Sequence, residues 1–170
     1  SGTDRVVFNA ATASVVVDLG AQTASGGAGN DSLISIEGAV GGAFADTLRG
    51  SAGADFLDGA DGADTLWGGI GADTLRGGDD GDRLDGGADA DNLAGGAGAD
   101  TLTGGAGNDR IDGGAGNDLA SYADATNSVT VNLVTLTATG GAGDDTLVSI
   151  EGVIGSDFDD TLTGGAGAAS

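Results

Sequence analysis

The sequence contains no cysteine, no histidine and no lysine. Without cysteine, neither disulfide bonds nor thiolate metal sites can hold the fold together. The absence of cysteine, histidine and lysine removes most of the side chains that act as nucleophiles, general acids or general bases. The sequence also has no irregular group of carboxylates opposed to an arginine. We therefore expect no catalytic site in this chain, which disfavours an enzyme built on a β-helix, such as a polysaccharide lyase.

Positive charge is almost absent as well. Five basic residues, all arginine, accompany 27 acidic residues, so the formal net charge is −22. Such a chain repels nucleic acid and anionic membranes and attracts cations. The sequence also has no signal peptide and no apolar run of transmembrane length. We expect a soluble polypeptide with no nucleic-acid partner and no membrane insertion, whose export signal lies outside these residues.

Aromatic residues make up only 4% of the chain, whereas 37 of its 170 residues are glycine. A glycine-rich, acidic composition with few aromatics is typical of disordered chains, which cannot bury enough apolar area to become ordered. The order of the residues contradicts disorder, because Gly41 to Ser121 consists of nine nonapeptides in unbroken register. The eighth position is leucine or isoleucine in all of them except the last, which has Ala120. The sixth position is always aspartate: Asp46, Asp55, Asp64, Asp73, Asp82, Asp91, Asp100, Asp109 and Asp118.

A longer period is superimposed on the nonapeptides. Residues 1–56 align with residues 115–170 at a constant offset of 114. Repeats at two periods indicate a segment of a longer tandem array. We expect three parts: residues 1–40 as the end of a preceding roll with a strand linker and a flanking repeat, residues 41–121 as a nine-nonapeptide roll, and residues 122–170 as a second strand linker and the start of the next block.

The nonapeptide predicts an all-β solenoid without helices. Its first six residues are mostly Gly, Ala and Asp, which favour turns because Gly reaches positive φ at little cost and Asp tolerates it. The next three residues alternate polar, apolar, polar, which is typical of a short half-buried strand. Two nonapeptides would form one rung, with eighth-position side chains inward and seventh and ninth outward. The alternating segments 13–19 and 128–133 predict longer strands that close one roll and start the next, with a partner-binding edge as the alternative.

Successive repeats would alternate between two faces of the solenoid and bring distant residues side by side. Arg49, Trp67 and Asp85 should form a column on one face, and Asp58 should neighbour Arg76 on the other. We interpret Trp67 as a residue that packs beneath Arg49 rather than as a ligand platform.

Hydrophobic burial alone cannot fold such a chain. Ordering a nonapeptide costs about 1–2 kcal/mol per residue, whereas burying its one leucine returns roughly 1.5–3 kcal/mol. Aligned aspartates in adjacent rungs, about 4.8 Å apart, would also repel one another. Ca²⁺ corrects these deficits, because it takes many oxygen ligands and can share the carboxylates and turn carbonyls of repeats n and n+2. Binding free energy then becomes folding free energy, and we expect several Ca²⁺ ions in the chain.

Copies such as GGIGADTLR (68–76), GGAGADTLT (95–103) and GGAGNDRID (104–112) resemble the RTX family, the hemolysin-type calcium-binding nonapeptide repeats of proteins exported by type I secretion. The resemblance covers residues 41–121 and extends to flanking units within 26–34, 140–148 and 155–163. It implies a right-handed parallel β-roll, a β-helix solenoid with Ca²⁺-binding turns. It also implies a chain that stays unfolded in the calcium-poor cytosol and folds after export.

The resemblance further implies which atoms bind the metal. Carboxylate ligands would come from the nine sixth-position aspartates and from Asp31, Asp145 and Asp160 in the flanking units. For Glu37 and Glu151 we favour a hydrogen bond to a turn over metal ligation. Carbonyl ligands would come from the early positions of the turns: Gly68, Gly69, Ile70, Gly71, Gly86, Gly87, Gly95, Gly96, Ala97, Gly98, Gly104, Gly105, Ala106, Gly107, Gly113, Gly114, Ala115 and Gly116.

Several turns depart from the repeated pattern. The fourth position is Asp80 and Asp89 in two copies, where aspartate tolerates positive φ and can add a carboxylate ligand. It is Phe44 and Phe158 in two others, where the bulky side chain argues against a regular site. Milder departures at second positions are Ser51 and Ala60.

Two functions share this chemistry. The first is a structural or secretion-supporting module of a large exported protein, such as an adhesin, an S-layer protein or a repeat-rich toxin, and the longer repeat favours it. The second is an accessory C-terminal domain of a type I-secreted hydrolase, protease, lipase or epimerase. In both cases the expected partner is calcium, the expected location is extracellular or the cell surface, and neighbouring blocks or cell-surface ligands of the parent protein are further candidate partners.

Overall fold

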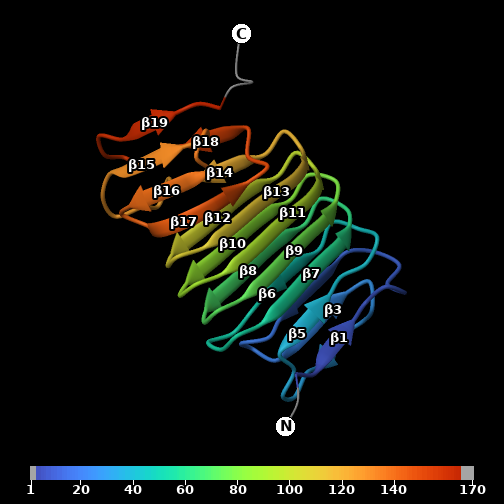
Figure 1. Cartoon of the computed structure of the whole chain (residues 1–170). Coiled ribbons are helices and arrows are strands. Elements are labelled where there is room, and N and C mark those ends of the chain that lie inside the picture. Colours follow the sequence, from blue (N-terminus) through green and yellow to red (C-terminus); the bar gives the residue numbers. More distant parts are fainter. Residues whose placement is uncertain (1–2, 166–170) are drawn as a thin grey trace.

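The computed structural model describes residues 3–165. They form nineteen strands and no α-helix, and accordingly no helix in this range is long and apolar enough to cross a membrane. Figure 1 shows the strands stacked along one axis, with the two ends of the chain at opposite ends of the stack. The all-β architecture and the parallel roll expected from the nonapeptide are confirmed.

The strands belong to two sheets. The first sheet contains, in spatial order, β1 (Arg5–Val7), β5 (Gly38–Val40), β7 (Phe56–Asp61), β9 (Thr74–Asp79), β11 (Asn92–Gly98), β13 (Arg110–Gly116), β17 (Gly143–Val148), β16 (Thr137–Gly140), β15 (Val129–Asn132) and β19 (Thr161–Thr163). The second contains β18 (Gly152–Ile154), β14 (Leu119–Ser121), β12 (Thr101–Ala106), β10 (Arg83–Ala88), β8 (Thr65–Ile70), β6 (Thr47–Arg49), β2 (Val15–Asp18), β3 (Thr23–Gly26) and β4 (Asp31–Ser32).

The register repeats every two nonapeptides. In the second sheet Leu66 lies opposite Leu84, and Leu84 lies opposite Leu102, each pair in a parallel ladder. In the first sheet Leu75 lies opposite Leu93 in the same way. Consecutive nonapeptides therefore alternate between the sheets, as the sequence predicts. The eighth-position side chains from both sheets form the core, and from Leu48 to Ala120 none is more than 2% exposed.

The strands are longer than predicted. Strands β7 to β13 run for six or seven residues, from the seventh position of one repeat through the third or fourth of the next, rather than for three. Pairing skips the first-position glycines Gly68 and Gly86 and resumes at Gly69 and Gly87. Gly87 has a φ of +105°, which a residue with a side chain rarely adopts, and this bend returns the main chain to the ladder. Only positions four to six are left as the turn.

Antiparallel strands interrupt the roll near both ends. Strand β2 pairs with β3, and β3 pairs with β4. In the same way β15 pairs with β16, and β16 pairs with β17. Strands β2 and β15 also pair in parallel with β6 and β19. The segments 13–19 and 128–133 thus contain strands, but each belongs to a three-stranded meander that stands where a simple turn would connect two rungs. We call these meanders the junctions.

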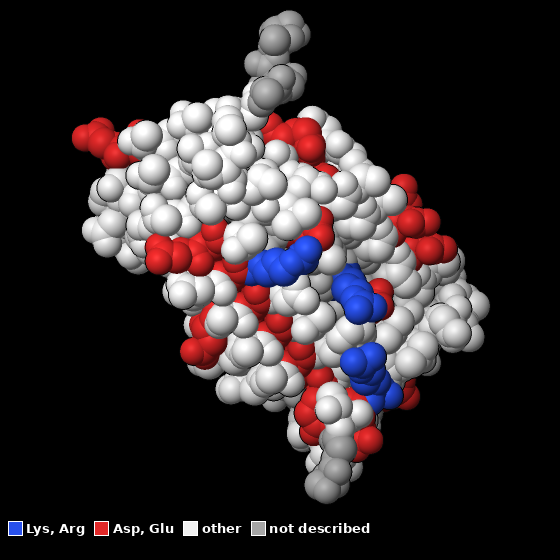
Figure 2. Space-filling model, in the orientation of Figure 1, with Lys and Arg blue, Asp and Glu red and all other residues white. Residues whose placement is uncertain are grey.

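The outward faces carry the few arginines. The guanidinium carbon of Arg49 lies 4.5 Å from the centre of the Trp67 ring, and Asp85 follows Trp67 in register, so the expected column exists. Asp58 lies opposite Arg76, also as expected. Figure 2 shows one face of the stack, on which the blue basic groups are few and lie apart from one another among white and red groups.

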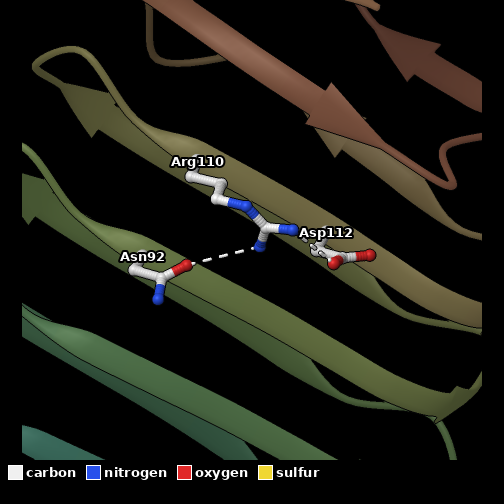
Figure 3. A network of polar contacts seen from close by, with 3 residues as sticks. All are labelled: Asn92, Arg110 and Asp112. Atoms are coloured by element: carbon white, nitrogen blue, oxygen red, sulfur yellow. Dashed lines mark hydrogen bonds and ion pairs between the residues drawn. The ribbon is translucent and has the colours of Figure 1, made fainter.

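Arg110 on β13 forms a separate contact on the outer face of the first sheet. It donates to Asp112 at 2.8 Å and to Asn92 of β11 at 3.5 Å (Figure 3). The bond to Asn92 joins neighbouring rungs at the surface, whereas Asp112 lies on the same strand as Arg110.

Candidate metal sites

Two columns of aspartates run along the stack. Each of the nine aspartates of residues 41–121 directly precedes a strand, so the 18-residue register places the sixth-position side chains of alternate repeats above one another. The first column contains Asp46, Asp64, Asp82, Asp100 and Asp118. The second column contains Asp55, Asp73, Asp91, Asp109 and Asp145. Every one of these residues is at most 5% exposed, which is unusual for aspartate and calls for a partner.

In both columns one carboxylate oxygen of each member after the first accepts a hydrogen bond from the preceding member and so joins two rungs. The main-chain N–H of Asp64 donates to Oδ1 of Asp82 at 2.8 Å, and the N–H of Asp82 donates to Oδ1 of Asp100 at 2.8 Å. The same bond recurs between all consecutive members of both columns, at 2.6–3.0 Å. The aspartates therefore have a structural function that the sequence pattern alone does not reveal.

The second oxygen of most of these carboxylates is buried without a hydrogen-bond partner. This holds for Oδ2 of Asp64, Asp73, Asp82, Asp91, Asp100, Asp109, Asp118 and Asp145. A buried, ionised oxygen without a partner is strongly unfavourable, and a cation is the partner that best satisfies a row of them. We call these eight the open carboxylates.

Main-chain oxygens converge on the same places. At first-position glycines the space that a side chain would fill is lined by the aspartate of the same turn and by a carbonyl of the next rung. A Cβ on Gly86 would lie against Asp91 Oδ2 and 2.6 Å from the Gly104 carbonyl oxygen. Among residues 3–165 no three carboxylates form a cluster, so carbonyls must supply most ligands of a cation held there. This mixture of carboxylate and carbonyl oxygens suits Ca²⁺.

Not every predicted carbonyl lies at this place. The first-position carbonyls of Gly68, Gly86, Gly95, Gly104 and Gly113 do. The second-position carbonyls of Gly69, Gly87 and Gly96 instead lie against the second-position glycine of the following rung. Ser149, which the sequence did not suggest, contributes a carbonyl beside Asp118 in the place of a first-position glycine. Its turn is recognisable afterwards, because Ser-Ile-Glu occurs at both 35–37 and 149–151.

Burial raises the pKa of seven of the column carboxylates, those of Asp64, Asp73, Asp82, Asp91, Asp100, Asp109 and Asp145. The pKa of Asp64, Asp82 and Asp91 rises to about 7, and that of Asp73 and Asp109 to about 6, chiefly because desolvation disfavours the charged form. The N–H donated to Oδ1 opposes this rise, and neighbouring carboxylates of the column add to it. Without metal, the columns contain closely spaced carboxylates and no positive charge to balance them. A divalent cation would supply that charge.

The flanking aspartates behave differently from one another. Asp145 joins the second column although it follows Asp109 by 36 residues, because a junction is inserted between them. The buried ring of Tyr122 lies at this junction, and the Asp145 carboxylate is a cause of the raised pKa of its hydroxyl, after desolvation. Asp31 was expected to be a ligand, but it is exposed on β4 at the edge of the second sheet, and the structure brings it into neither column.

Two glutamates take over the Oδ1 function, each directly before a strand, β18 for Glu151 and β5 for Glu37. Glu151 accepts a hydrogen bond from the Asp118 N–H at 3.0 Å, and Glu37 accepts one from the Asp4 N–H at 3.0 Å. Asp80 and Asp89 adopt φ of +74° and +75°, the conformation considered for them from the sequence.

A comparison with known families identifies one that matches over most of the chain. The model of the RTX calcium-binding nonapeptide repeat matches residues 18–35, 40–75, 58–93, 85–120, 137–149 and 153–168. The matched residues include every aspartate of both columns. They leave out Glu37 and Glu151. A comparison with curated proteins gives no significant match.

Proposed function

Because the chain belongs to the RTX calcium-binding nonapeptide repeat family, whose repeats bind several Ca²⁺ ions and form a structural rather than catalytic module, we propose that it is a calcium-dependent structural module of an exported protein. The nine repeats of residues 41–121 are the calcium-binding unit, and residues 1–40 and 122–170 contain the junctions to neighbouring blocks. The observation that carries this proposal is the set of buried Oδ2 atoms without a partner.

The ligands in this proposal come from successive rungs of each column. An open carboxylate such as Asp91 contributes Oδ2, and the carbonyl of Gly104 from the next rung faces the same space. Asp109 follows Asp91 in the column and presents its own Oδ2. A cation placed between rungs would therefore neutralise the mutual repulsion of carboxylates that the fold forces together.

Calcium supply then controls folding. The chain carries a formal net charge of −22, and the folded columns add buried carboxylates that repel one another. At low calcium the extended, hydrated chain is favoured, since the core of a rung is only two apolar side chains deep. At external calcium concentrations ion binding supplies the missing free energy. This order of events suits a protein that crosses a membrane unfolded and folds outside the cell.

A role as spacer or surface module is supported by the 114-residue repeat. Junction β15–β16–β17 occurs at the end of the nine-repeat roll, and junction β2–β3–β4 precedes it. A module bounded by two similar junctions is built for tandem repetition, as in adhesins and S-layer proteins. Neighbouring blocks of the same kind are the partners that this arrangement favours.

A calcium titration followed by circular dichroism tests the proposal. We expect a cooperative change from coil to β-structure as CaCl₂ rises, with a midpoint in the range of about 10⁻⁴ to 10⁻³ M, reversed by chelator. Trp67 fluorescence reports the same transition at one outward face. MgCl₂ serves as the control and should be a poor substitute, because Mg²⁺ prefers a rigid octahedron and retains its water ligands. A purified chain that keeps its β signal and melting temperature after exhaustive EDTA dialysis contradicts the proposal.

A further inference from the structure

Three of the predicted ligands differ from the open carboxylates in how their second oxygen is satisfied. In Asp46, Asp55 and Asp160 this oxygen accepts a hydrogen bond from the main-chain N–H of the second-position residue of the same turn. We call these three the closed carboxylates. The distinction bears on which turns hold the ions of the proposed function, and it rests on that function.

In Asp55 two donors of one residue close the second oxygen. Its Oδ2 accepts both the N–H of Ser51, at 2.5 Å, and the hydroxyl of Ser51, at 2.9 Å. Two donors occupy both lone-pair directions of that oxygen. A cation at the same oxygen would have to displace these bonds and would meet the positive ends of both donor dipoles. The charge of the carboxylate is thus already stabilised by the chain itself.

Asp46 and Asp160 are closed by a turn and by a junction together. Oδ2 of Asp46 accepts the Gly42 N–H at 2.7 Å, while its Oδ1 accepts the Val15 N–H of junction strand β2 at 2.7 Å. Asp160 accepts the Ser156 N–H on Oδ2 at 2.7 Å, and Val129 of junction strand β15 donates to its Oδ1 at 2.9 Å. Hydrogen bonds to the charged form hold the pKa of Asp160 below its ordinary value.

The conformation of the second-position residue separates the two classes within the roll. In the seven repeats that contain Asp64 to Asp118, this residue has φ between +79° and +122°, even where it is Ala60. Gly42, Ser51 and Ser156, which donate to the closed carboxylates, do not have positive φ. A second-position serine therefore marks a closed turn in two of the three cases, which the sequence makes visible.

We infer that Asp46, Asp55 and Asp160 do not bind Ca²⁺, and that Ca²⁺ is held only by the open carboxylates from Asp64 onward. The closed turns are the first turns after each junction, beside β2 and β5 at one end and β15 at the other. Each block of repeats thus begins with turns that the main chain satisfies without metal. Such turns offer a preformed edge on which the first calcium-dependent rungs can pair.

Calcium counting in a matched pair of variants tests the inference. Asp55→Asn and Asp73→Asn change adjacent members of the same column. In Asp73→Asn the amide oxygen can keep the bond that Oδ1 accepts from the Asp55 N–H, and in Asp55→Asn it can keep the bonds that Oδ2 accepts from Ser51. Bound calcium is measured by equilibrium dialysis at saturating CaCl₂, with folding verified by circular dichroism. We expect Asp73→Asn to bind one ion fewer than the unaltered chain, or to bind one ion at least tenfold more weakly. Asp55→Asn should retain the full number at unchanged affinity.

Asp160→Asn provides an independent arm, because Asp160 precedes β19, the edge strand of the first sheet, and lies outside the nine repeats of residues 41–121. It should also retain every ion. Loss of an ion from folded Asp55→Asn or Asp160→Asn overturns the inference, as does an Asp73→Asn chain that binds calcium normally. Should Asp55→Asn fail to fold at any calcium concentration, Asp160→Asn decides. An unaltered chain that binds no calcium refutes the proposed function itself. In a chain that binds calcium, the ion counts of the three variants test the inference alone.

Discussion

The main-chain N–H of Asp91 donates a hydrogen bond of 2.9 Å to Oδ1 of Asp109, which lies one rung further along the stack. Oδ2 of the same Asp109 carboxylate is buried without a partner. One side chain therefore joins two rungs with one oxygen and presents the other for a cation. Its removal should disturb both the ladder and the metal.

Asp109→Ala should raise the calcium midpoint of folding far more than Asp112→Ala. The first substitution removes a ligand and leaves the buried Asp91 N–H unsatisfied, which alone costs about 1–3 kcal/mol, or roughly tenfold in an equilibrium constant. The second removes a half-exposed ion pair with Arg110, of the kind worth about 0–1 kcal/mol. Circular dichroism titrations of both variants measure the difference. Equal shifts in the two midpoints would show that the sixth position is not the ligand position.

Gly86→Ala should weaken calcium binding by occupying the space between Asp91 and the next rung. A Cβ there would meet Asp91 Oδ2 and the Gly104 carbonyl oxygen, and Gly86 has no positive φ, so the effect is steric rather than a matter of backbone strain. Overpacking of this kind costs about 1–3 kcal/mol. We expect a calcium midpoint raised by roughly tenfold or more.

The matched control for this substitution is Gly53→Ala. A Cβ at Gly53 meets no atom within 4 Å, and its φ is also not positive. The control should leave the midpoint within about twofold, or lower it slightly by reducing the entropy of the unfolded chain. A Gly86→Ala midpoint indistinguishable from that of Gly53→Ala would mean that the cation does not lie beside the first-position glycine.

The sequence predicts the regular part of this molecule because each physical requirement recurs at one phase. Leu66, Leu84 and Leu102 must be buried in register, and that alone sets the 18-residue rung. Asp64, Asp82 and Asp100 then have to lie above one another, whichever ion they bind. The length of the strands was underestimated, since composition cannot show that pairing resumes after a bend at Gly87.

The irregular part was less accessible because it depends on contacts between distant residues. Asp31 lies in a nonapeptide (GGAGNDSLI) similar to that of Asp145 (GGAGDDTLV), yet only Asp145 has a rung on which to stack, and so only Asp145 is buried. The second-position serine Ser51 is visible in the sequence, but the sequence does not show that its main-chain N–H and its hydroxyl both donate to Asp55. Local pattern thus identifies candidate ligands, and tertiary position decides among them.

Metal-free chain should gain β-structure on mild acidification. The folded pKa of Asp64, Asp82 and Asp91 is about 7, above the value of about 3.9 for an unfolded aspartate. The folded state therefore binds protons more tightly, and stability falls as pH rises through 6–7 and is recovered towards pH 4. Circular dichroism in EDTA at pH 8 and pH 5.5 measures this.

When calcium is present, the dependence of folding stability on pH should reverse, because protons compete with the metal for the same carboxylates. The calcium midpoint should rise as the pH is lowered from 8 to 5.5. A metal-free chain that loses β signal on acidification, at a concentration where sedimentation shows no aggregation, would contradict the raised pKa of the columns.

Leu93→Ala should destabilise the calcium-loaded roll without changing the number of bound ions. Leu93 is fully buried between Leu75 and Ile111 of adjacent rungs, and truncation of such a side chain costs about 2–5 kcal/mol. Ile70→Ala, at a side chain that is 58% exposed, is the control and should change stability by less than about 0.5 kcal/mol. Urea unfolding at saturating calcium and equilibrium dialysis measure stability and ion count separately.

Because ligand binding stabilises only the folded state, higher calcium should restore folding of Leu93→Ala. A lost ion in this variant would instead mean that core packing and metal sites are not separable in this fold.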